Sequence, residues 1–171
     1  MGETNPMTHE WLQGEFQVST DPDRLQMDVI HGYLSTSYWA NGITREVLAR
    51  AIANSIPFGL YHNGRQVGFA RAVTDRATFA YFADVFVLET HRGRGLAQWM
   101  VDCALRHPEL GGLRNWVLAT RDAHELYRRA GYAPLRFPDR WMQRHGAHYD
   151  GASGRGPSVT TEHSKNHTER S

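Results

Sequence analysis

Apolar residues recur at helical spacing in some stretches of this chain and at strand spacing in others, which predicts a mixed α/β fold. The stretch EFQVS (15–19) alternates as a short strand does. A helix is expected next, with Asp21 as its N-cap and Pro22 in its first turn. The residues expected on its buried face are Leu25, Val29, Ile30 and Tyr33.

A second helix is expected after Thr44, whose hydroxyl can accept a hydrogen bond from the first turn. Pro57 ends this helical region, because proline cannot continue a helix. The residues expected on the buried side of the helix are Val47, Leu48, Ala51 and Ile52.

The clearest local signal is a β-hairpin over residues 58–75, FGLYHNGRQVGFARAVTD. Asn63 and Gly64 suit a two-residue type I′ turn, because both residues tolerate a positive φ. An aromatic-rich run follows at 78–89 and pairs naturally with the strand before it. Three antiparallel strands are therefore expected ahead of residue 90.

The run 96–107 predicts a helix that Pro108 ends. One face of this helix carries Leu96, Met100, Cys103 and Ala104. The apolar run NWVLAT (115–120) predicts a short strand after it.

A last helix is expected over 123–130, with Asp122 as its cap and Gly131 as the residue that closes it. The run YAPLRF (132–137) is the expected final strand. Helices and strands thus alternate to the end of the apolar part of the chain.

Composition indicates one globular domain. The chain has 171 residues, of which 40% are hydrophobic and 11% aromatic. The formal net charge of +1 gives no global electrostatic case for a nucleic-acid partner. Cys103 is the single cysteine, which excludes an intramolecular disulfide and a cysteine-based zinc site.

No signal-peptide pattern opens the sequence, and no apolar run approaches the roughly 20 residues of a membrane span. A soluble, cytoplasmic protein without a membrane partner is the expectation. Composition changes near Gly146, after which large apolar side chains almost disappear. We expect one domain over 1–145 and a disordered tail over 146–171. The tail's histidines (148, 163 and 167) are expected to be solvated rather than to bind metal.

The stretch THRGRGLAQWMVD (90–102) places two glycines and two arginines between an expected strand and an expected helix. The first turn of a helix has free N–H groups and the positive end of the helix dipole. Glycines let a phosphate approach the backbone, and arginines can cover its outer oxygens. The stretch lacks the GxxxxGKS/T pattern of a P-loop, and it follows an antiparallel region, unlike a dinucleotide-binding loop. A diphosphate site and a plain tight turn both remain open on this evidence.

Two motifs resemble the GCN5-related N-acetyltransferase (GNAT) superfamily. Residues 92–97, RGRGLA, match the R/Q-x-x-G-x-G/A signature of that superfamily. The segment AHELYRRAGY matches the later A-x-x-x-Y-x-x-x-G-F/Y pattern, with Ala123, Tyr127, Gly131 and Tyr132 in register. The resemblance covers about residues 15–140. Stretches such as SYWANG and LATRDAHELY are similar to a bacterial branch whose members mostly lack an assigned substrate.

The resemblance implies an α/β (α+β) GNAT fold: a mixed, mainly antiparallel sheet, splayed between its fourth and fifth strands and flanked by helices. Acetyl-CoA would lie in the opening as co-substrate, with no metal. The backbone of Val85, Phe86 and Val87 would pair with the pantetheine arm, and the Val87 N–H would stabilise the oxyanion. The residues implied at the pyrophosphate are Arg92, Gly93, Arg94, Gly95, Leu96 and Ala97. Thr120 stands where many members have an asparagine that contacts the cofactor arm.

Tyr127 matches the position of the general acid that protonates the departing thiolate, although an amphipathic core tyrosine is the simpler alternative. Asp84, an acid inside an apolar strand, is a candidate base or substrate ligand unless a buried arginine pairs with it. His124 is the other candidate base, and a water relay could replace either residue.

The acceptor pocket is expected beside the first helix and the fourth strand. Tyr38 and Trp39 could enclose an ammonium group or simply pack against the helices. The other residues expected at this pocket are Arg71, Asp75, Phe79, Asp84, Arg121 and Asp122.

Two functions remain open after this reading. The first is an acetyl-CoA-dependent N-acetyltransferase whose acceptor is a primary amine, either a small amine, an amino acid analogue or a protein amine. The second is a catalytically idle acyl-CoA-binding sensor or subunit. Nucleic-acid binding is not expected, because the arginines gather at one loop. A homodimer is left open.

Overall fold

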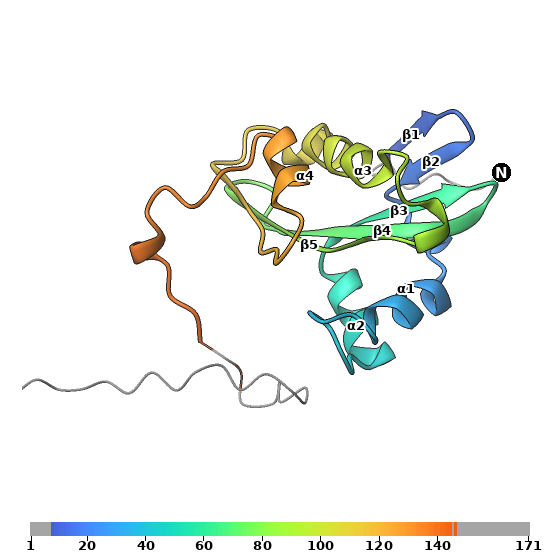
Figure 1. Ribbon diagram of the computed structural model, residues 1–171, viewed down its shortest axis with the longest axis horizontal. Helices are drawn as coiled ribbons and strands as arrows, with labels where there is room; N and C mark the ends of the chain where they lie inside the picture. Colours follow the sequence, from blue (N-terminus) through green and yellow to red (C-terminus); the bar gives the residue numbers. More distant parts are fainter. Residues whose placement is uncertain (1–7, 145, 147–171) are drawn as a thin grey trace, which may run out of the picture.

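A six-stranded sheet with helices on both faces forms the protein (Figure 1). The structure is a computed structural model that describes residues 8–144 and 146. The strands are β1 (Glu10–Gln13), β2 (Phe16–Ser19), β3 (Ile56–His62), β4 (Arg65–Thr74), β5 (Phe79–Val87) and β6 (Asn115–Val117). They lie in sequence order across the sheet, and only the β5–β6 pair is parallel.

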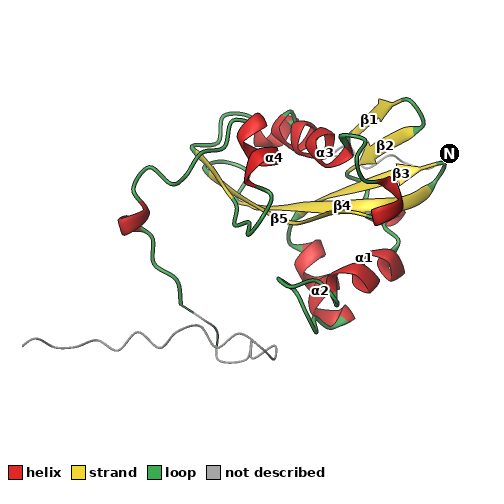
Figure 2. Ribbon diagram, viewed as in Figure 1, coloured by secondary structure: helices red, strands yellow, loops and turns green. Residues whose placement is uncertain are grey.

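Four helices cover the sheet: α1 (Met27–Leu34), α2 (Arg45–Ala53), α3 (Leu96–Leu105) and α4 (His124–Arg129). Figure 2 shows α1 and α2 on one face and α3 and α4 on the other. Each face has its own hydrophobic core. Phe69 and Phe86 pack with α1 and α2, whereas Phe82 and Val87 pack with α3. The expected fold class is therefore confirmed.

The N-terminal region departs from the prediction in two ways. The expected first strand is present as β2, but β1 precedes it as a hairpin partner. Asp21 caps only a three-residue 3₁₀ helix, Pro22–Arg24, and α1 begins later, at Met27. The reason is a contact with the sheet. The Gln26 N–H donates to Gln66 Oε1 at 2.6 Å, so the backbone leaves the helical path between the two elements.

The second helix agrees more closely with its prediction. Thr44 caps α2, because its Oγ1 accepts from the Val47 N–H at 3.3 Å. Leu48 and Ile52 are buried, but Val47 is 40% exposed, since α2 packs along one i, i+4 line only. Pro57 lies inside β3 rather than at a helix end.

The three-stranded antiparallel region is confirmed. Asn63 and Gly64 have φ values of 50° and 77°, as a type I′ turn between β3 and β4 requires. α3 also follows its prediction, with Leu96, Met100, Cys103 and Ala104 all buried.

The C-terminal part contains two corrections. Asp122 does not cap α4; the N-cap is Ala123, whose N–H donates to Thr120 Oγ1 at 3.0 Å. Gly131 closes the helix at φ 89°, as expected. The strand predicted at 132–137 is absent, because the Tyr132 N–H returns to the Tyr127 carbonyl and the chain then runs away from the sheet (Figure 1).

The tail predicted at 146–171 lies outside the described residues except for Gly146. Within the described chain, none of the helices is both long enough and apolar enough to span a bilayer.

His107 connects the N-terminal strand to the core. Its ring is 1% exposed and lies 4.6 Å, centroid to centroid, from the ring of His9. Nδ1 accepts from the Glu109 N–H at 3.2 Å, and Nε2 has no partner within the described residues. Burial, assisted by His9, lowers the pKa of His107 to about 4.

A group whose pKa is lowered on folding binds fewer protons in the folded state than in the unfolded state. Between pH about 6.5 and about 4, the free energy of unfolding should therefore fall as pH falls, by on the order of 3 kcal/mol. In His107→Asn this decline should be flatter, because asparagine keeps the cap and does not titrate. Denaturant titrations across this pH range test this. Parallel declines in the two proteins would assign the effect to other groups.

Candidate active site

A bulge in β5 shapes the site. Arg71 of β4 pairs with Ala83, whereas Phe69 pairs with Phe86, so Ala70 faces two residues of β5 instead of one. Asp84 is one of these two and has a φ of 58°, a conformation that aspartate tolerates better than most residues. Such a bulge bends and twists its strand.

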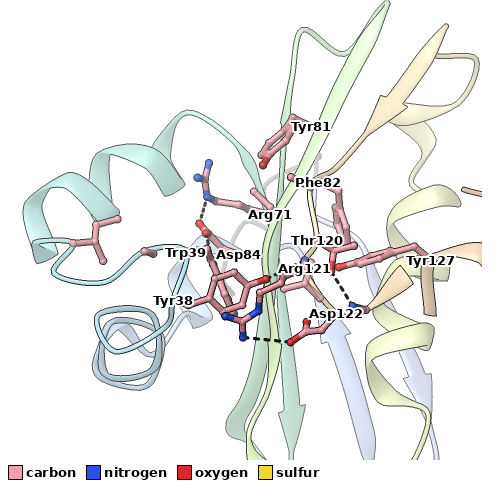
Figure 3. A pocket seen from close by; sticks show the side chains of 16 residues that line it. Tyr38, Trp39, Arg71, Tyr81, Phe82, Asp84, Thr120, Arg121, Asp122 and Tyr127 are labelled. Atoms are coloured by element: carbon pink, nitrogen blue, oxygen red, sulfur yellow. Dashed lines mark hydrogen bonds and ion pairs between the residues drawn. The ribbon is translucent and has the colours of Figure 1, made fainter. Parts of the chain in front are cut away.

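β5 and β6 separate just before this bulge. Their last paired residues are Tyr81 and Val117, so the edge of β5 beyond Tyr81 is not bonded to β6. A cavity of about 490 Å³ lies at the separation (Figure 3). The predicted site residues that line it are Tyr38, Trp39, Arg71, Asp84, Val85, Thr120, Arg121, Asp122 and Tyr127.

Asp84 is paired with the buried arginine that the sequence analysis considered as one alternative. Arg71 Nε donates to Asp84 Oδ2 at 2.5 Å, and Trp39 Nε1 donates to Oδ1 at 3.2 Å. The side chains of Arg71 and Asp84 are 17% and 8% exposed. Both carboxylate oxygens therefore have a donor, and the ion pair lies largely out of water.

Tyr38 and Arg121 connect the two sides of the cavity. The Arg121 guanidinium lies 3.9 Å from the centre of the Tyr38 ring, and the Arg121 N–H donates to the Tyr38 hydroxyl at 3.3 Å. Arg121 Nη2 also lies 3.5 Å from Asp122 Oδ2. The segment after α1 is thus joined to the loop after β6 above the cavity. The aromatic ring expected to hold an ammonium group instead stacks on an arginine of the protein.

Tyr127 enters the cavity from α4, on the opposite side from Arg71 and Asp84 (Figure 3). It is 8% exposed, and burial raises the pKa of its hydroxyl to about 12. Its hydroxyl makes no hydrogen bond within the described chain. The hydroxyl is therefore protonated at neutral pH and free to donate to a ligand.

The glycine-rich loop forms a second cavity of about 310 Å³ at the start of α3. Gly93 and Gly95 have φ values of 75° and 74°, which residues with side chains rarely adopt, and open space lies where their Cβ atoms would be. Val87, Arg92, Leu96 and Ala97 also line this cavity. The free N–H groups of the first turn of α3 lie at the same place.

The two loop arginines do different things. Arg92 Nε donates to the Val87 carbonyl and Nη2 donates to the Tyr33 hydroxyl, both at 3.0 Å. Arg92 thus ties the loop to the end of β5 and to α1. Arg94 does not line the cavity, and its guanidinium lies 6.0 Å from the centre of the Phe16 ring.

Three predicted acceptor or base residues lie away from the 490 Å³ cavity. Asp75 and Phe79 do not line it; Asp75 is a turn residue that accepts from the N–H groups of Ala77, Thr78 and Phe79. These hydrogen bonds lower the pKa of Asp75. His124 does not line the 490 Å³ cavity; it lines a third cavity, whose wall also includes Tyr127 and Thr120. Phe79 lies at the start of β5, where it still pairs with Asn115 of β6, so it lies before the point at which the two strands separate.

The residues at the site that were missed include Tyr81 and Arg129. Tyr81 lines the 490 Å³ cavity, and burial and the nearby Asp84 raise the pKa of its hydroxyl. Arg129 of α4 lines the loop cavity, four residues after Glu125. Phe86, by contrast, turns its side chain into the core beneath α1 and α2.

Metal chemistry and a thiol nucleophile find no support in the part of the chain that the structure describes. No group of three His, Cys, Asp or Glu side chains there is placed to hold a metal ion. Cys103 is fully buried, and burial raises the pKa of its thiol to about 11. It is a small core residue, as predicted.

Comparisons with known proteins agree with this geometry. A family model described as "Acetyltransferase (GNAT) domain" matches residues 53–134. A curated relative from the fungus Gibberella zeae, named "Putative acetyltransferase FG08082", is 36% identical over 140 residues, which are 68% of this chain and 78% of the relative. The similarity is therefore not confined to bacteria.

Solved structures give the same result. A crystal structure from Xanthomonas campestris pv. campestris, titled "putative acetyltransferase belonging to the gnat family", is 46% identical, with a TM-score of 0.77. The match covers 80% of this chain and 97% of that one. A Clostridium acetobutylicum protein, described as a predicted acetyltransferase with acetyl-CoA, shares the fold at 13% identity and a TM-score of 0.57, covering 81% of this chain and 96% of that one. The chain belongs to the GNAT acetyltransferase family.

Proposed function

We propose that this protein is an acetyl-CoA-dependent N-acetyltransferase that acts on a primary amine by direct transfer. One observation carries the proposal. The glycine loop at the start of α3 and the unpaired edge of β5 lead to a cavity that is lined by Tyr127, whose hydroxyl has no hydrogen-bond partner in the described chain. The loop could bind a diphosphate, the edge of β5 an extended arm, and the cavity a thioester.

The residues present fit acetyl-CoA. The positive φ of Gly93 and Gly95 turns the loop, and the space beside them admits a phosphate to the backbone amides of α3. The edge of β5 from Val85 to Val87 is not paired with β6 and could bond to the amides of the pantetheine arm. Because Arg92 is engaged by Val87 and Tyr33, backbone groups would bind the pyrophosphate, and Arg92 would keep the loop in shape.

Tyr127 would act as the general acid. In the reaction the amine nitrogen bonds to the thioester carbonyl carbon, the carbon–sulfur bond breaks, and the thiolate takes a proton from Tyr127. The nitrogen loses a proton to water as the amide forms, and the Tyr127 phenolate regains one from water. A phenol whose pKa is raised by burial stays protonated at neutral pH and can supply that proton. The Val87 N–H remains our candidate donor to the oxyanion.

Neither proposed side-chain base is well placed. Asp84 accepts hydrogen bonds from both Arg71 and Trp39, so both of its oxygens are already engaged by the protein. His124 lies at a different cavity. We therefore propose that the ammonium group of the acceptor loses its proton to water in the open cavity, and that Asp84 positions Arg71.

The first experiment is calorimetric titration with acetyl-CoA, followed by a thiol-release assay against pools of amines. Binding with amine-dependent release of CoA supports the enzyme. Binding without release on any pool, including peptides, would favour the idle acyl-CoA sensor, and no binding would contradict the cofactor site itself.

Gly95→Val should raise the dissociation constant for acetyl-CoA by roughly tenfold to a hundredfold, the cost of losing one or two charge-assisted hydrogen bonds. A β-branched residue cannot adopt the φ of 74° without strain, and its side chain would fill the space needed by the phosphate. Gly112→Val is the matched control, since Gly112 has a φ of 79° and lies outside both site cavities. Equal affinity losses in the two variants would mean that backbone strain alone explains the result.

Tyr127→Phe should lower kcat by about a hundredfold or more while acetyl-CoA affinity changes little, because only the proton donor is lost. Tyr132→Phe is the control. Its ring lies 5.8 Å from that of Tyr127, and its buried hydroxyl has no partner within the described residues. Full activity of Tyr127→Phe in a steady-state thiol-release assay would assign Tyr127 to packing.

A further inference from the structure

Arg71 is held in a fixed orientation on the side of the 490 Å³ cavity that lies opposite Tyr127 (Figure 3). Its Nε is bonded to Asp84, whose other oxygen is bonded to Trp39, and the Arg71 side chain is only 17% exposed. A guanidinium fixed in this way loses little conformational entropy when it binds a ligand.

The outer edge of this guanidinium is free. Figure 3 shows the two terminal nitrogens of Arg71 turned away from Asp84, and neither has a hydrogen-bond or ion-pair partner among residues 8–144. Tyr81 also lines this part of the cavity and carries a second donor group. Two parallel N–H groups at the end of a planar fork match the two oxygens of a carboxylate.

Asp84, in contrast, is not available to a cation. Both of its oxygens already accept hydrogen bonds, and its charge is balanced by Arg71 at 2.5 Å. A polycationic acceptor would find a neutralised carboxylate and would face the guanidinium beside it. Asp122, the other carboxylate of the lining, also lies beside an arginine, Arg121, at 3.5 Å. At the Arg71 side of the cavity, therefore, the free donor groups suit an anion better than a cation.

We propose that the acceptor is a small amine that also carries a carboxylate, an α-amino acid or a close analogue, and that the terminal nitrogens of Arg71 bind that carboxylate. The inference rests on the proposed function and deepens it. Arg71 and Tyr127 lie on opposite sides of the same cavity, so a molecule anchored at Arg71 would extend its amine toward the proton donor (Figure 3). A cavity of about 490 Å³ that also admits the thioester has room for an acceptor of the size of an amino acid.

The experiment compares each of the common amino acids with its α-amide. The amide keeps the size and the amine but replaces the carboxylate by a neutral group. Binding to the protein saturated with CoA is measured by calorimetry, and turnover with acetyl-CoA by thiol release. For the preferred side chain, the acid should bind and react roughly tenfold to a hundredfold better than the amide, as expected for a hydrogen-bonded charge pair.

Variants assign this preference to Arg71. Arg71→Met alone would leave Asp84 buried and unpaired, so the test uses the double variant Arg71→Met with Asp84→Asn. Asparagine tolerates the φ of 58° and can still accept from Trp39. The preference for acid over amide should disappear in the double variant and be weakened but kept in Asp84→Asn, which keeps the guanidinium but removes the charge that orients it. Arg65→Met, the same substitution at an exposed position of β4, is the control for folding and should keep the preference.

Amine turnover without a preference for acids would overturn this inference and leave the proposed function intact. A loss of binding for acids and amides alike in both Asp84→Asn and the double variant, with the fold unchanged, would also overturn it, because Asp84 would then be the ligand of the amine. If acetyl-CoA does not bind, the proposed function fails. The calorimetric comparison of acid and amide on the free protein still decides whether Arg71 binds a carboxylate.

Discussion

The extra residue in β5 is the constraint on which the site depends. Ala70 of β4 faces two residues of β5, and the strand bends there while the short strand β6 does not follow it. The separation of the two strands leaves a cavity between the segment that joins α1 to α2 on one side and α4 on the other. It also leaves an edge of backbone groups beyond Tyr81 that β6 does not bond. Without the bulge, β5 and β6 could continue their ladder and close this edge.

The bulge also determines which side chains meet. Asp84 leaves the regular alternation of the strand and reaches both Arg71 and Trp39, so one carboxylate joins β4, β5 and the segment after α1. Removing either charge would leave the other one buried without a partner, which is costly. The pair is therefore a rigid structural element as well as part of the cavity wall. Because the pair is rigid, the free edge of Arg71 can bind a ligand without reorganisation.

Much of this could be predicted from the sequence where local rules decide the structure. The Asn63-Gly64 turn, the Thr44 cap and the glycines of the loop before α3 each depend on backbone preferences of one or two residues. The order of two motifs was enough to indicate the family. The predicted start of the first helix was wrong because it depends on a long-range contact. That contact, between Gln26 and Gln66, joins residues 40 positions apart. No local pattern reports such a contact.

The candidate site shows the same division. The loop and Tyr127 were found because a motif gives their spacing, whereas Tyr81 and Arg129 carry no motif and enter the site through the sheet and α4. Asp84 was noticed as a charge in an apolar strand, but its partner could not be chosen, because Arg71 lies on the next strand and the bulge shifts the register between them.

Arg92 has a different role from the one that its sequence position suggests. The sequence suggests an arginine for a phosphate, yet its guanidinium holds Val87 and Tyr33, which couples the position of the loop to the end of β5. The geometry of the glycine loop can thus depend on a charged residue that binds the protein itself.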